Sequence, residues 1–287
     1  MMKHHPTSDH SALLDSENAT EMARLLLQDR FLTQAMGGPL AEQQDVTTMQ
    51  RVLDVGCGPG GWVLDVAFAS PKVDVVGIDV SHIMVTYGRA QAWAQGLENA
   101  HFQVMDVREP LAFPEQHFDL INIRLLASVL PTHAWSPLIQ ACRRLLRPGG
   151  ILRLTEAENG FTTSAAWERI GSLCMQAMHQ SGHSFAPGGT QVAITPMLRP
   201  FLVDAGFQDI EERAHVLPFS AGTPAHEAVC RNFLILLDLL RSAVIELGLT
   251  SDEEWSALCH QASIDSLSST FRALWFLLTT WGRVPRE

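Results

Sequence analysis

Residues 51–61 read RVLDVGCGPGG: a short apolar run, Arg51–Val55, is followed at once by a loop that holds four glycines. An apolar helical pattern comes next, from about Trp62 to Ala69. Glycines between a strand and a helix allow the backbone to approach a ligand closely, because no Cβ stands in the way. The run therefore predicts a strand, a ligand-binding turn and a helix, and it indicates an α/β fold.

The same alternation continues toward the C-terminus. Four more apolar runs lie at Val73–Ile78, Phe102–Met105, Phe118–Ile123 and Ile151–Thr155, and helical patterns lie between them at Ile83–Gln95 and Trp135–Leu146. Strands that alternate with helices at this spacing form parallel sheets with right-handed crossovers. We therefore expect a parallel sheet with helices on both faces over the first half of the chain.

The second half of the chain is less regular. Its helical patterns are Phe161–Gln180, Met197–Ala205, His226–Leu247 and Asp252–Ser263, its strand pattern is Asp209–Leu217, and Ala273–Gly282 is ambiguous between helix and strand. No internal repeat or low-complexity linker divides the sequence. Residues 46–287 are therefore expected to form one domain, with helical insertions around 158–200 and 224–270.

Residues 1–45 precede the first strand and are expected to lie outside the sheet. Residues 1–20 are polar and contain histidines, which predicts a mobile segment. Glu21–Met36 carries apolar residues at three- and four-residue steps and is followed by Gly-Gly-Pro, which predicts an amphipathic helix. Because this helix has no place in the sheet, we expect it to cover the ligand site as a lid and not to join the core. The polar residues with which it could reach the ligands are Arg24, Gln28 and Arg30.

Composition and charge narrow the class of function. Hydrophobic residues make up 46% of the chain and charged residues 18%, as in a globular enzyme. The formal net charge of −11 repels a phosphate backbone, which argues against nucleic acid as a partner. The cluster Arg143, Arg144 and Arg147 lies at the end of a predicted helix, where cations favour the macrodipole.

Cysteine usage and the apolar segments indicate a cytoplasmic protein. The five cysteines include no C-x-x-C pair, which is typical of reduced thiols. Residues 1–11 lack the apolar core of a signal peptide. The longest apolar stretches, Phe233–Leu240 and Ala273–Leu278, are too short to cross a bilayer, so no membrane partner is expected. The sequence leaves the oligomeric state open and allows a homo-oligomer.

The glycine loop satisfies two ligand-binding patterns at once. Gly56, Gly58 and Gly61 fit G-x-G-x-x-G, which binds nicotinamide dinucleotides, whereas Gly56, Gly58 and Gly60 fit G-x-G-x-G. Alone, the loop does not separate a nicotinamide enzyme from an enzyme that uses S-adenosylmethionine (SAM).

The pattern of three carboxylates around the loop favours one of the two ligands. Asp79 ends the second strand, where it can accept from both hydroxyls of a ribose in either kind of site. Asp54, two residues before the first glycine, suits a bound ammonium and would repel a pyrophosphate. Asp106 ends the third predicted strand, where it can accept from an adenine amine. A lone Asp at such a place is more often a loop or cap residue, but three at successive strand ends favour a SAM site.

At this point the sequence resembles a known superfamily. The segments VLDVGCGPGGW, VVGIDVS, FQVMDV, FDLINIRLLASVL and LLRPGGILRLTE are similar to motifs of the class I SAM-dependent methyltransferases over residues 51–157. The resemblance implies a Rossmann-like, mostly parallel sheet of seven strands in the order 3-2-1-4-5-7-6. Asp209–Leu217 would be strand six, and Ala273–Gly282 would be an antiparallel strand seven.

The resemblance also implies a cofactor and its site. SAM would be bound with its methionine part near Asp54, Gly56, Cys57 and Gly58, its ribose near Asp79 and Val80, and its adenine near Asp106 and Val107. Met84 would pack on the adenosine, and the main chain of Arg124, just after strand four, would meet the cofactor amine.

The methyl acceptor is less well defined by the sequence. Glu158, just after strand five, is the first candidate for a general base, although a solvated or capping carboxylate is the commoner case. No metal is expected, because Gly182 separates His179 from His183 and no third ligand is evident. The chain lacks the Asn/Asp-Pro-Pro-aromatic sequence found in many nucleobase and glutamine methyltransferases. A small acceptor, as in secondary metabolism, is therefore expected, and it would be covered by apolar residues from the set Phe161, Trp167, Met175, Met178 and Phe185.

Three classes of function remain open. The first is a SAM-dependent methyltransferase with an O-, C- or N-acceptor, in which methylation of an alkene could also start a cyclisation. The second is an NAD(P)-dependent oxidoreductase, supported by the doubled glycine pattern alone. The third is a SAM-binding protein without transfer activity, because a cofactor motif does not ensure an aligned acceptor.

Overall fold

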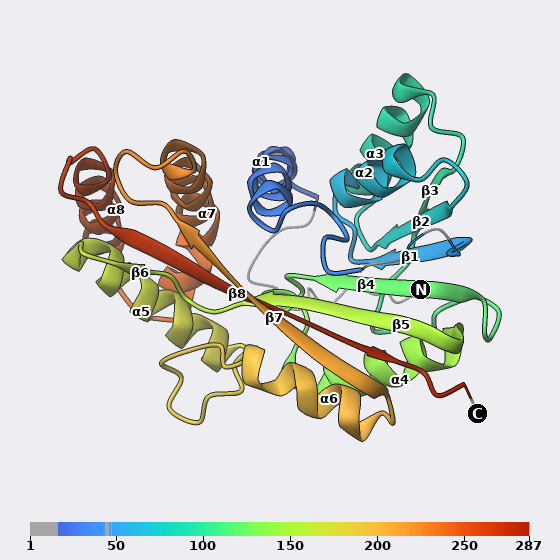
Figure 1. Ribbon diagram of the computed structural model, residues 1–287. Helices are drawn as coiled ribbons and strands as arrows, with labels where there is room; N and C mark the ends of the chain where they lie inside the picture. The colour runs from blue at the N-terminus through green and yellow to red at the C-terminus, as the bar shows by residue number, and fades with distance from the viewer. Residues whose placement is uncertain (1–16, 44–45, 47, 287) are drawn as a thin grey trace, which may run out of the picture.

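The computed structural model describes residues 17–43, 46 and 48–286. The expectation of a mobile segment falls mainly on residues 1–16, which lie outside the described residues. The described strands form one sheet in the order β3-β2-β1-β4-β5-β8-β6, and β7 pairs with β8 (Figure 1). No helix in the described part of the chain is long and apolar enough to span a membrane.

Five parallel strands build the half of the sheet that holds the glycine loop. They are β1 (Arg51–Val55), β2 (Asp74–Asp79), β3 (Ala100–Val104), β4 (Phe118–Arg124) and β5 (Leu146–Ala157). The crossover helices are α2 (Gly61–Ala69), α3 (His82–Gln95) and α4 (Trp135–Leu145). All but the last residue of β4 is buried, since helices cover both faces of a parallel sheet. The predicted order of these strands is confirmed.

A long antiparallel strand completes the sheet. β8 (Ala273–Arg283) pairs with β5 along one edge and with β7 (Gln208–Pro218) along the other. Buried and less buried residues alternate from Ala273 to Leu278, and this period of two is what a strand requires. The ambiguous segment is therefore a strand, and the expected order 3-2-1-4-5-7-6 holds for the seven main strands. The expected count is wrong by one, because a two-residue strand, β6 (Phe161–Thr162), also pairs with β8.

The two faces of the parallel half are covered by different helices. Figure 1 shows α2 and α3 on one face, and α4 together with α6 (Leu198–Asp204) on the other. Trp135 of α4 and Phe201 of α6 stack with ring centroids 5.8 Å apart, which fixes these two helices against each other. Short 3-10 helices precede them, η1 (Thr132–Ala134) before α4 and η2 (Thr195–Met197) before α6.

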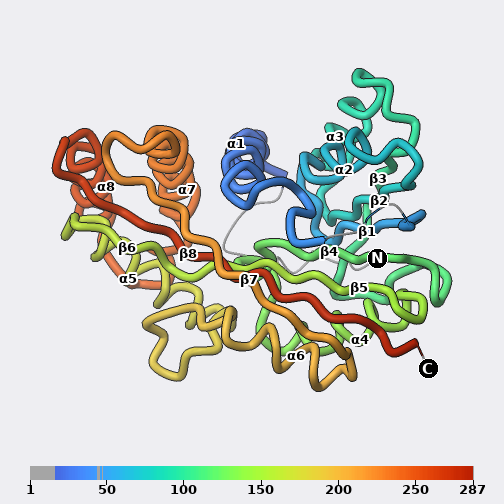
Figure 2. The backbone as a smooth tube through the Cα atoms, viewed as in Figure 1, coloured from blue at the N-terminus to red at the C-terminus, as the bar shows by residue number. Residues whose placement is uncertain are grey.

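A second group of helices packs beside the N-terminal end of β8. These helices are α1 (Ala19–Ala35), α5 (Ala165–Gln180), α7 (His226–Glu246) and α8 (Asp252–Ser266). They bury an apolar cluster that includes Trp167, Trp255 and Trp275. Figures 1 and 2 show α1 between α7 on one side and α2 with α3 on the other. The helical insertions expected after strands five and six therefore form one compact group.

The N-terminal helix begins and ends near its predicted bounds. Asn18 caps it, because its side chain accepts hydrogen bonds from the backbone N–H groups of Thr20 and Glu21. Phe31 and Leu32 are buried in the second apolar cluster, with 7% and 1% relative exposure. The expectation that this helix stays out of the core is therefore wrong, since its apolar stripe joins the core that α7 and β8 form.

Candidate functional site

A cavity of about 530 Å³ lies at the carboxyl ends of the parallel strands. The glycine loop, α1 and the ends of β4 and β5 form one part of its wall. Apolar side chains from α5, α7 and β8 form the other part. One cavity therefore joins the glycine loop to the group of helices beside β8.

The glycine loop has the backbone that its sequence predicts. Gly58 has a φ of 53° and Gly60 a φ of 86°, values that side chains rarely allow. A Cβ on Gly60 would overlap the ring of Phe102, whereas a Cβ on Gly58 would meet only Leu25, at 3.6 Å. Gly60 is thus required by packing, whereas Gly58 lies in the cavity wall, where a Cβ would make only an ordinary contact with Leu25. Gly56 and Cys57 line the same wall.

Asp79 ties the glycine loop to the end of β2. Its carboxylate accepts hydrogen bonds from the backbone N–H of Gly58 at 2.8 Å and from that of Ser81 at 2.9 Å. Burial raises the pKa of this carboxyl, while the two N–H donors oppose the shift. Val80 and Met84 line the cavity next to it, the first exposed and the second almost fully buried. The structure brings these three predicted residues together.

Asp54 is the first member of a chain of buried, hydrogen-bonded polar side chains. The Asn122 side chain donates to Asp54 at 2.7 Å, and its oxygen accepts from Arg153 at 2.6 Å. Arg153 in turn pairs with Glu42, and both side chains are almost completely buried. Burial raises the pKa of Asp54 to about 7, although Arg124 and Asn122 favour its charged form. Asp54 also lines the cavity, so this carboxyl can face a ligand.

Asp106 and Val107 lie at the rim of the cavity, on the side of β3. Strand β3 ends at Val104, so the expectation that Asp106 ends this strand is wrong by two residues. The Asp106 carboxylate accepts from the guanidinium and the backbone N–H of Arg108 at 2.9–3.1 Å. These bonds lower its pKa and keep it charged. The position fits the predicted adenine side of the site.

The Arg124 side chain has contacts that the sequence analysis did not predict. Arg124 is the last residue of β4 and does not follow the strand, and its side chain lies in the cavity wall. There it forms an ion pair with Asp29 of α1 and donates to Thr33 at 3.1 Å. The next residue, Leu125, has a φ of 56°, which is strained for a branched side chain. A helix-to-strand ion pair at this place could not be read from the sequence.

Glu158, the candidate base, is engaged by a loop. Its carboxylate accepts from the backbone N–H of Ala193 at 2.9 Å, and from the N–H and hydroxyl of Thr195 at 2.9 and 2.8 Å. Although Glu158 lines the cavity, both oxygens anchor the segment before α6. The arrangement favours a structural role for Glu158 over that of a free base.

Glu156 was not among the predicted site residues. Its carboxyl is buried, lines the cavity, and accepts from the backbone N–H of Leu126 at 2.7 Å. Burial raises its pKa to about 8, against the effect of the Leu126 and Ala127 N–H donors. The sequence did hold a signal for Glu156, because its carboxyl lies at the end of a buried strand, two residues before the predicted base. Glu156 fixes the loop that follows β4.

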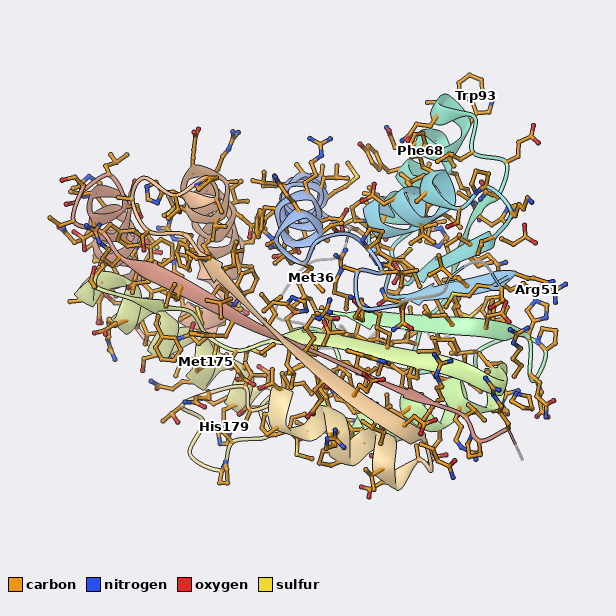
Figure 3. The ribbon with its side chains drawn as sticks, in the orientation of Figure 1. Met36, Arg51, Phe68, Trp93, Met175 and His179 are labelled. Carbon is orange, nitrogen blue, oxygen red and sulfur yellow. The ribbon has the colours of Figure 1, made fainter. Side chains whose placement is uncertain are left out.

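Part of the predicted apolar cover lies in the cavity wall. Trp167, Met175 and Met178 line it, whereas Phe161 is 62% exposed and Phe185 packs in the core below α6. Figure 3 shows Met175 and His179 on α5, and His179 contacts the loop at Gly189. No group of His, Cys, Asp and Glu that could hold a metal ion occurs among the residues the structure describes.

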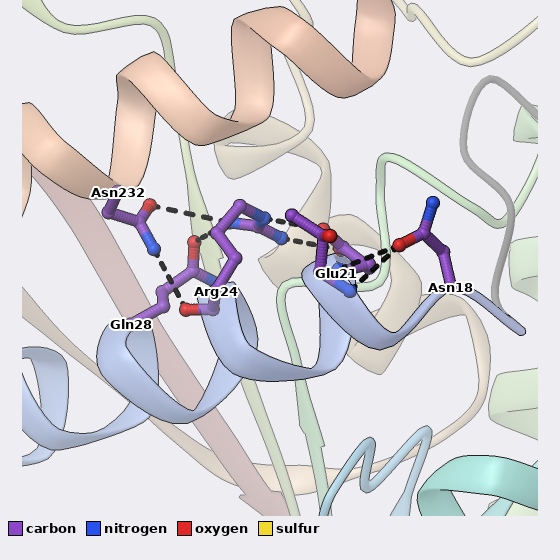
Figure 4. Close-up of polar contacts among 6 residues, drawn as sticks. Asn18, Glu21, Arg24, Gln28 and Asn232 are labelled. Atoms are coloured by element: carbon purple, nitrogen blue, oxygen red, sulfur yellow. Dashed lines mark hydrogen bonds and ion pairs between the residues drawn. The ribbon is translucent and has the colours of Figure 1, made fainter.

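Polar residues of α1 lie at the cavity, but most of their hydrogen bonds go to other residues of the protein. Figure 4 shows Arg24 paired with Glu21, and bonded to Gln28 and to Asn232 of α7. Asn232 also donates to the backbone oxygen of Arg24 at 3.0 Å. Arg24 and Gln28 line the cavity as predicted, whereas Arg30 is exposed and is not part of its wall. This cluster fastens α1 to α7.

The sheet order, the glycine loop and the carboxyls at adjacent strand ends define a ligand-binding α/β domain of the Rossmann-like class. Residues 52–150 match a family described as "Methyltransferase domain". Together with the sheet order, this match supports the resemblance of residues 51–157 to the class I SAM-dependent methyltransferases.

Individual relatives agree with this match. The methyltransferase pytC of Aspergillus terreus is 29% identical over 171 residues, which cover 59% of this chain and 49% of pytC. A ubiquinone biosynthesis O-methyltransferase of Acinetobacter baumannii is 30% identical over 101 residues, which cover 35% of this chain and 41% of that protein. The chain thus spans about half the length, or less, of these curated relatives. The crystal structure of the YcgJ protein from Bacillus subtilis has the same fold, with a TM-score of 0.55 at 18% identity, and covers 88% of this chain and 99% of its own.

Proposed function

We propose that this chain transfers a methyl group from SAM to a small, largely apolar acceptor. The observation that carries the proposal is that one cavity joins a glycine loop with carboxyls to a chamber of apolar side chains. The names of the relatives support methyl transfer, and one of them is an O-methyltransferase. The proposal includes oxygen, nitrogen and carbon acceptors.

The residues of the glycine-loop side fit SAM. Gly58 leaves open the space that a Cβ would take, and Asp79 lies beside it with a carboxylate for the ribose hydroxyls. Asp54 would face the ammonium, and Asp106 with Val107 would lie by the adenine. Met84 would pack against the adenosine, since it is buried in the same wall. When bound, SAM supplies an electrophilic methyl group on a sulfonium.

The acceptor would occupy the chamber between α5, α7 and β8. Its wall consists of side chains such as Ile170, Met175, Phe233, Leu237 and Trp275. Such a wall excludes water and offers little to a highly charged molecule. The net charge of −11 further disfavours nucleic acid as the acceptor. An apolar metabolite, such as a product of secondary metabolism, fits the chamber best.

Alignment of the acceptor would contribute much of the rate. Transfer from a sulfonium is an in-line displacement, and a base is needed only when the acceptor must lose a proton. Glu158 is bound to Ala193 and Thr195, and Glu156 is bound to the loop after β4. The residues of this chain would therefore act mainly by holding the acceptor, fixing the β4 loop and excluding water.

We further propose that α1 covers both halves of the cavity. Asp29 and Leu25 lie over the glycine loop, while Arg24 and Gln28 face the chamber. A helix in this position would have to move, at least in part, to admit ligands. It would then be a lid that is also part of the core.

The test is methyl transfer from labelled SAM to a panel of phenols, indoles, terpenoids, tRNA and protein. We expect label in at least one apolar small molecule and none in tRNA or protein. Calorimetry with SAM and with NAD(H) is the companion measurement. Binding of NAD(H) without SAM would replace the proposal by an oxidoreductase, and binding of SAM without transfer to any acceptor would leave a SAM-binding protein.

A further inference from the structure

An ion pair between Arg124 and Asp29 lies in the cavity wall beside the glycine loop. Arg124 ends β4 and Asp29 lies on α1, so the pair joins elements that are distant in sequence. Both side chains line the cavity and are mostly buried, at 13% and 12% relative exposure. Thr33, one turn farther along α1, accepts a hydrogen bond from Arg124 at 3.1 Å. The pair is therefore a fixed part of the site and not a surface contact.

The pair is also close to the carboxyl assigned to the ligand's ammonium. A Cβ on Gly61, the first residue of α2, would overlap the Asp29 carboxylate, so Asp29 lies directly against the loop. Burial raises the pKa of Asp54 to about 7, the Arg124 charge opposes that shift, and the Asp29 charge adds to it. Arg124, Asp29 and Asp54 thus form one electrostatic group at the glycine-loop end of the cavity.

This group carries more negative than positive charge. It consists of the carboxyls of Asp29 and Asp54 and the guanidinium of Arg124, whereas Arg153 is already paired with Glu42. A complementary ligand group would bring one carboxylate for the arginine and positive charge for the acids. The amino-acid end of SAM has this pattern, because its carboxylate is joined by an ammonium and a sulfonium.

We propose that Arg124 and Asp29 bind the amino-acid end of SAM, and that their ion pair opens when this end enters. Arg124 then donates to the ligand's carboxylate, and Asp29 joins Asp54 in accepting from its ammonium. A guanidinium suits this task because its N–H groups match the two oxygens of a carboxylate. The exchange leaves each buried charge with a partner, which removing only one member of the pair would not. This inference rests on the proposed function.

The exchange would give α1 a direct contact with the cofactor. Asp29 is the residue through which α1 touches the ligand's ammonium, while Asn232 fastens the same helix to α7. Asp29 and Arg24, the α1 residues at these two attachments, both line the cavity. Binding of the amino-acid end would then hold α1 over the chamber from the cofactor side.

The experiment compares ligands with and without the amino-acid end. Binding of S-adenosylhomocysteine and of 5′-methylthioadenosine is measured by calorimetry for the wild type, Arg124→Met and Asp29→Asn. Loss of a charged hydrogen bond should lower the affinity for S-adenosylhomocysteine by about 10- to 100-fold in each variant. The affinity for 5′-methylthioadenosine, which lacks the amino-acid end, should change by less than about two-fold. Arg241→Met, which breaks an exposed ion pair on α7, is the matched control and should change neither affinity.

A second arm isolates the carboxylate. Decarboxylated SAM should bind the wild type more weakly than SAM, and Arg124→Met should remove this difference. Equal losses for both ligands in the first arm, or an unchanged preference for SAM in Arg124→Met, would overturn the inference. If Arg124→Met does not fold, Asp29→Asn and the wild-type comparison still decide it. A wild type that binds none of these ligands would instead refute the proposed function.

Discussion

Asp54 is a carboxyl whose titration should be visible in ligand binding. Its pKa is raised to about 7 by burial, against the opposing charges of Arg124 and Arg153 and with the Asp29 charge adding to the shift. The polar groups that face it are Asn122 from β4, Arg124, Arg153 from β5, Asp29 from α1, and Cys57 in the loop. A ligand ammonium requires the ionised carboxyl, so binding should release a proton near neutral pH.

The expected result is a SAM affinity that rises as the pH is raised from 6 toward 7.5. It should stop rising near pH 8, where an α-amino group loses its own proton. Calorimetry in buffers of different ionisation enthalpy would measure the released proton. Asp54→Asn should bind SAM more weakly and without this rise. A wild-type affinity that is constant from pH 6 to 7.5 would contradict the assignment of Asp54.

The same group makes a prediction for stability. A carboxyl whose pKa is higher in the folded than in the unfolded protein binds more protons when folded, so the free energy of unfolding falls as the pH rises between the two values. For Asp54 this window extends from about 4 to about 7. Asp54→Asn should therefore be more stable, relative to the wild type, at pH 8 than at pH 5. Chemical denaturation of both proteins at these two pH values checks the sign.

Glu158 can be tested as an anchor against its predicted role as a base. Glu158→Gln should weaken the charged hydrogen bonds from Ala193 and Thr195 and lower the free energy of unfolding by about 1–3 kcal/mol. Turnover should fall only as far as this loop is disturbed, and the pH dependence of kcat should be unchanged. A fold as stable as the wild type with a large loss of kcat would instead identify Glu158 as the base.

At the scale of elements, α1 is the helix on which both halves of the site depend. Asn232 of α7 holds it by donating to the backbone oxygen of Arg24 and accepting from its guanidinium. Asn232→Leu keeps the side-chain volume but removes both bonds to Arg24, whose guanidinium retains Glu21 and Gln28, so the free energy of unfolding should fall by about 0.5–1.5 kcal/mol. We also expect faster proteolysis within α1, measured by limited digestion.

The matched control for Asn232→Leu is Arg231→Leu, because Arg231 is the exposed neighbour of Asn232 on the same helix. It should leave the proteolysis rate of α1 unchanged. Addition of SAM should slow the digestion of wild-type α1 if this helix contacts the ligand through Asp29. Equal digestion of Asn232→Leu and the wild type would show that the Arg24 cluster does not fasten the helix.

The sequence predicted the elements whose patterns are local. The glycine loop, Asp54 and Asp79 lie where the motif placed them, because a strand, a turn and a helix in immediate succession leave little freedom. The role of Arg124 could not be predicted in the same way, since its partner Asp29 is 95 positions away along the chain. The same holds for Glu158, whose loop partners follow it by 35 and 37 positions. Pairing across such separations depends on tertiary packing, which a single sequence does not reveal.

The predicted exclusion of α1 from the core failed for a related reason. Its apolar stripe was correctly read, but the surface that it covers is made by α7 and β8, which lie at the other end of the sequence. β8 itself was ambiguous because a short apolar run fits a helix or a buried strand. Its pairing with both β5 and β7 decided the outcome.

At the scale of the whole molecule, the chain combines two structures around one cavity. The parallel half carries the glycine loop and the match to the methyltransferase domain over residues 52–150. Helices α5 and α7 lie outside that match and supply apolar side chains to the cavity wall. Cofactor binding and acceptor binding should therefore be separable by substitutions on the two sides.

Two substitutions should block the two sides independently. Gly58→Val would place a branched side chain on a left-handed backbone and in the open space of the loop, so we expect loss of SAM binding. Met175→Trp would fill the acceptor chamber from α5, so we expect SAM affinity within about two-fold of the wild type but little methyl transfer. Calorimetry and the labelled-methyl assay measure these two effects.

Gln180→Trp, an exposed position on α5, is the control for the added volume and should retain transfer. Because overpacking costs about 1–3 kcal/mol, the melting temperature of each variant is measured first. Loss of SAM binding in a folded Met175→Trp protein would show that the two sides are one site, and full transfer by it would place the acceptor elsewhere.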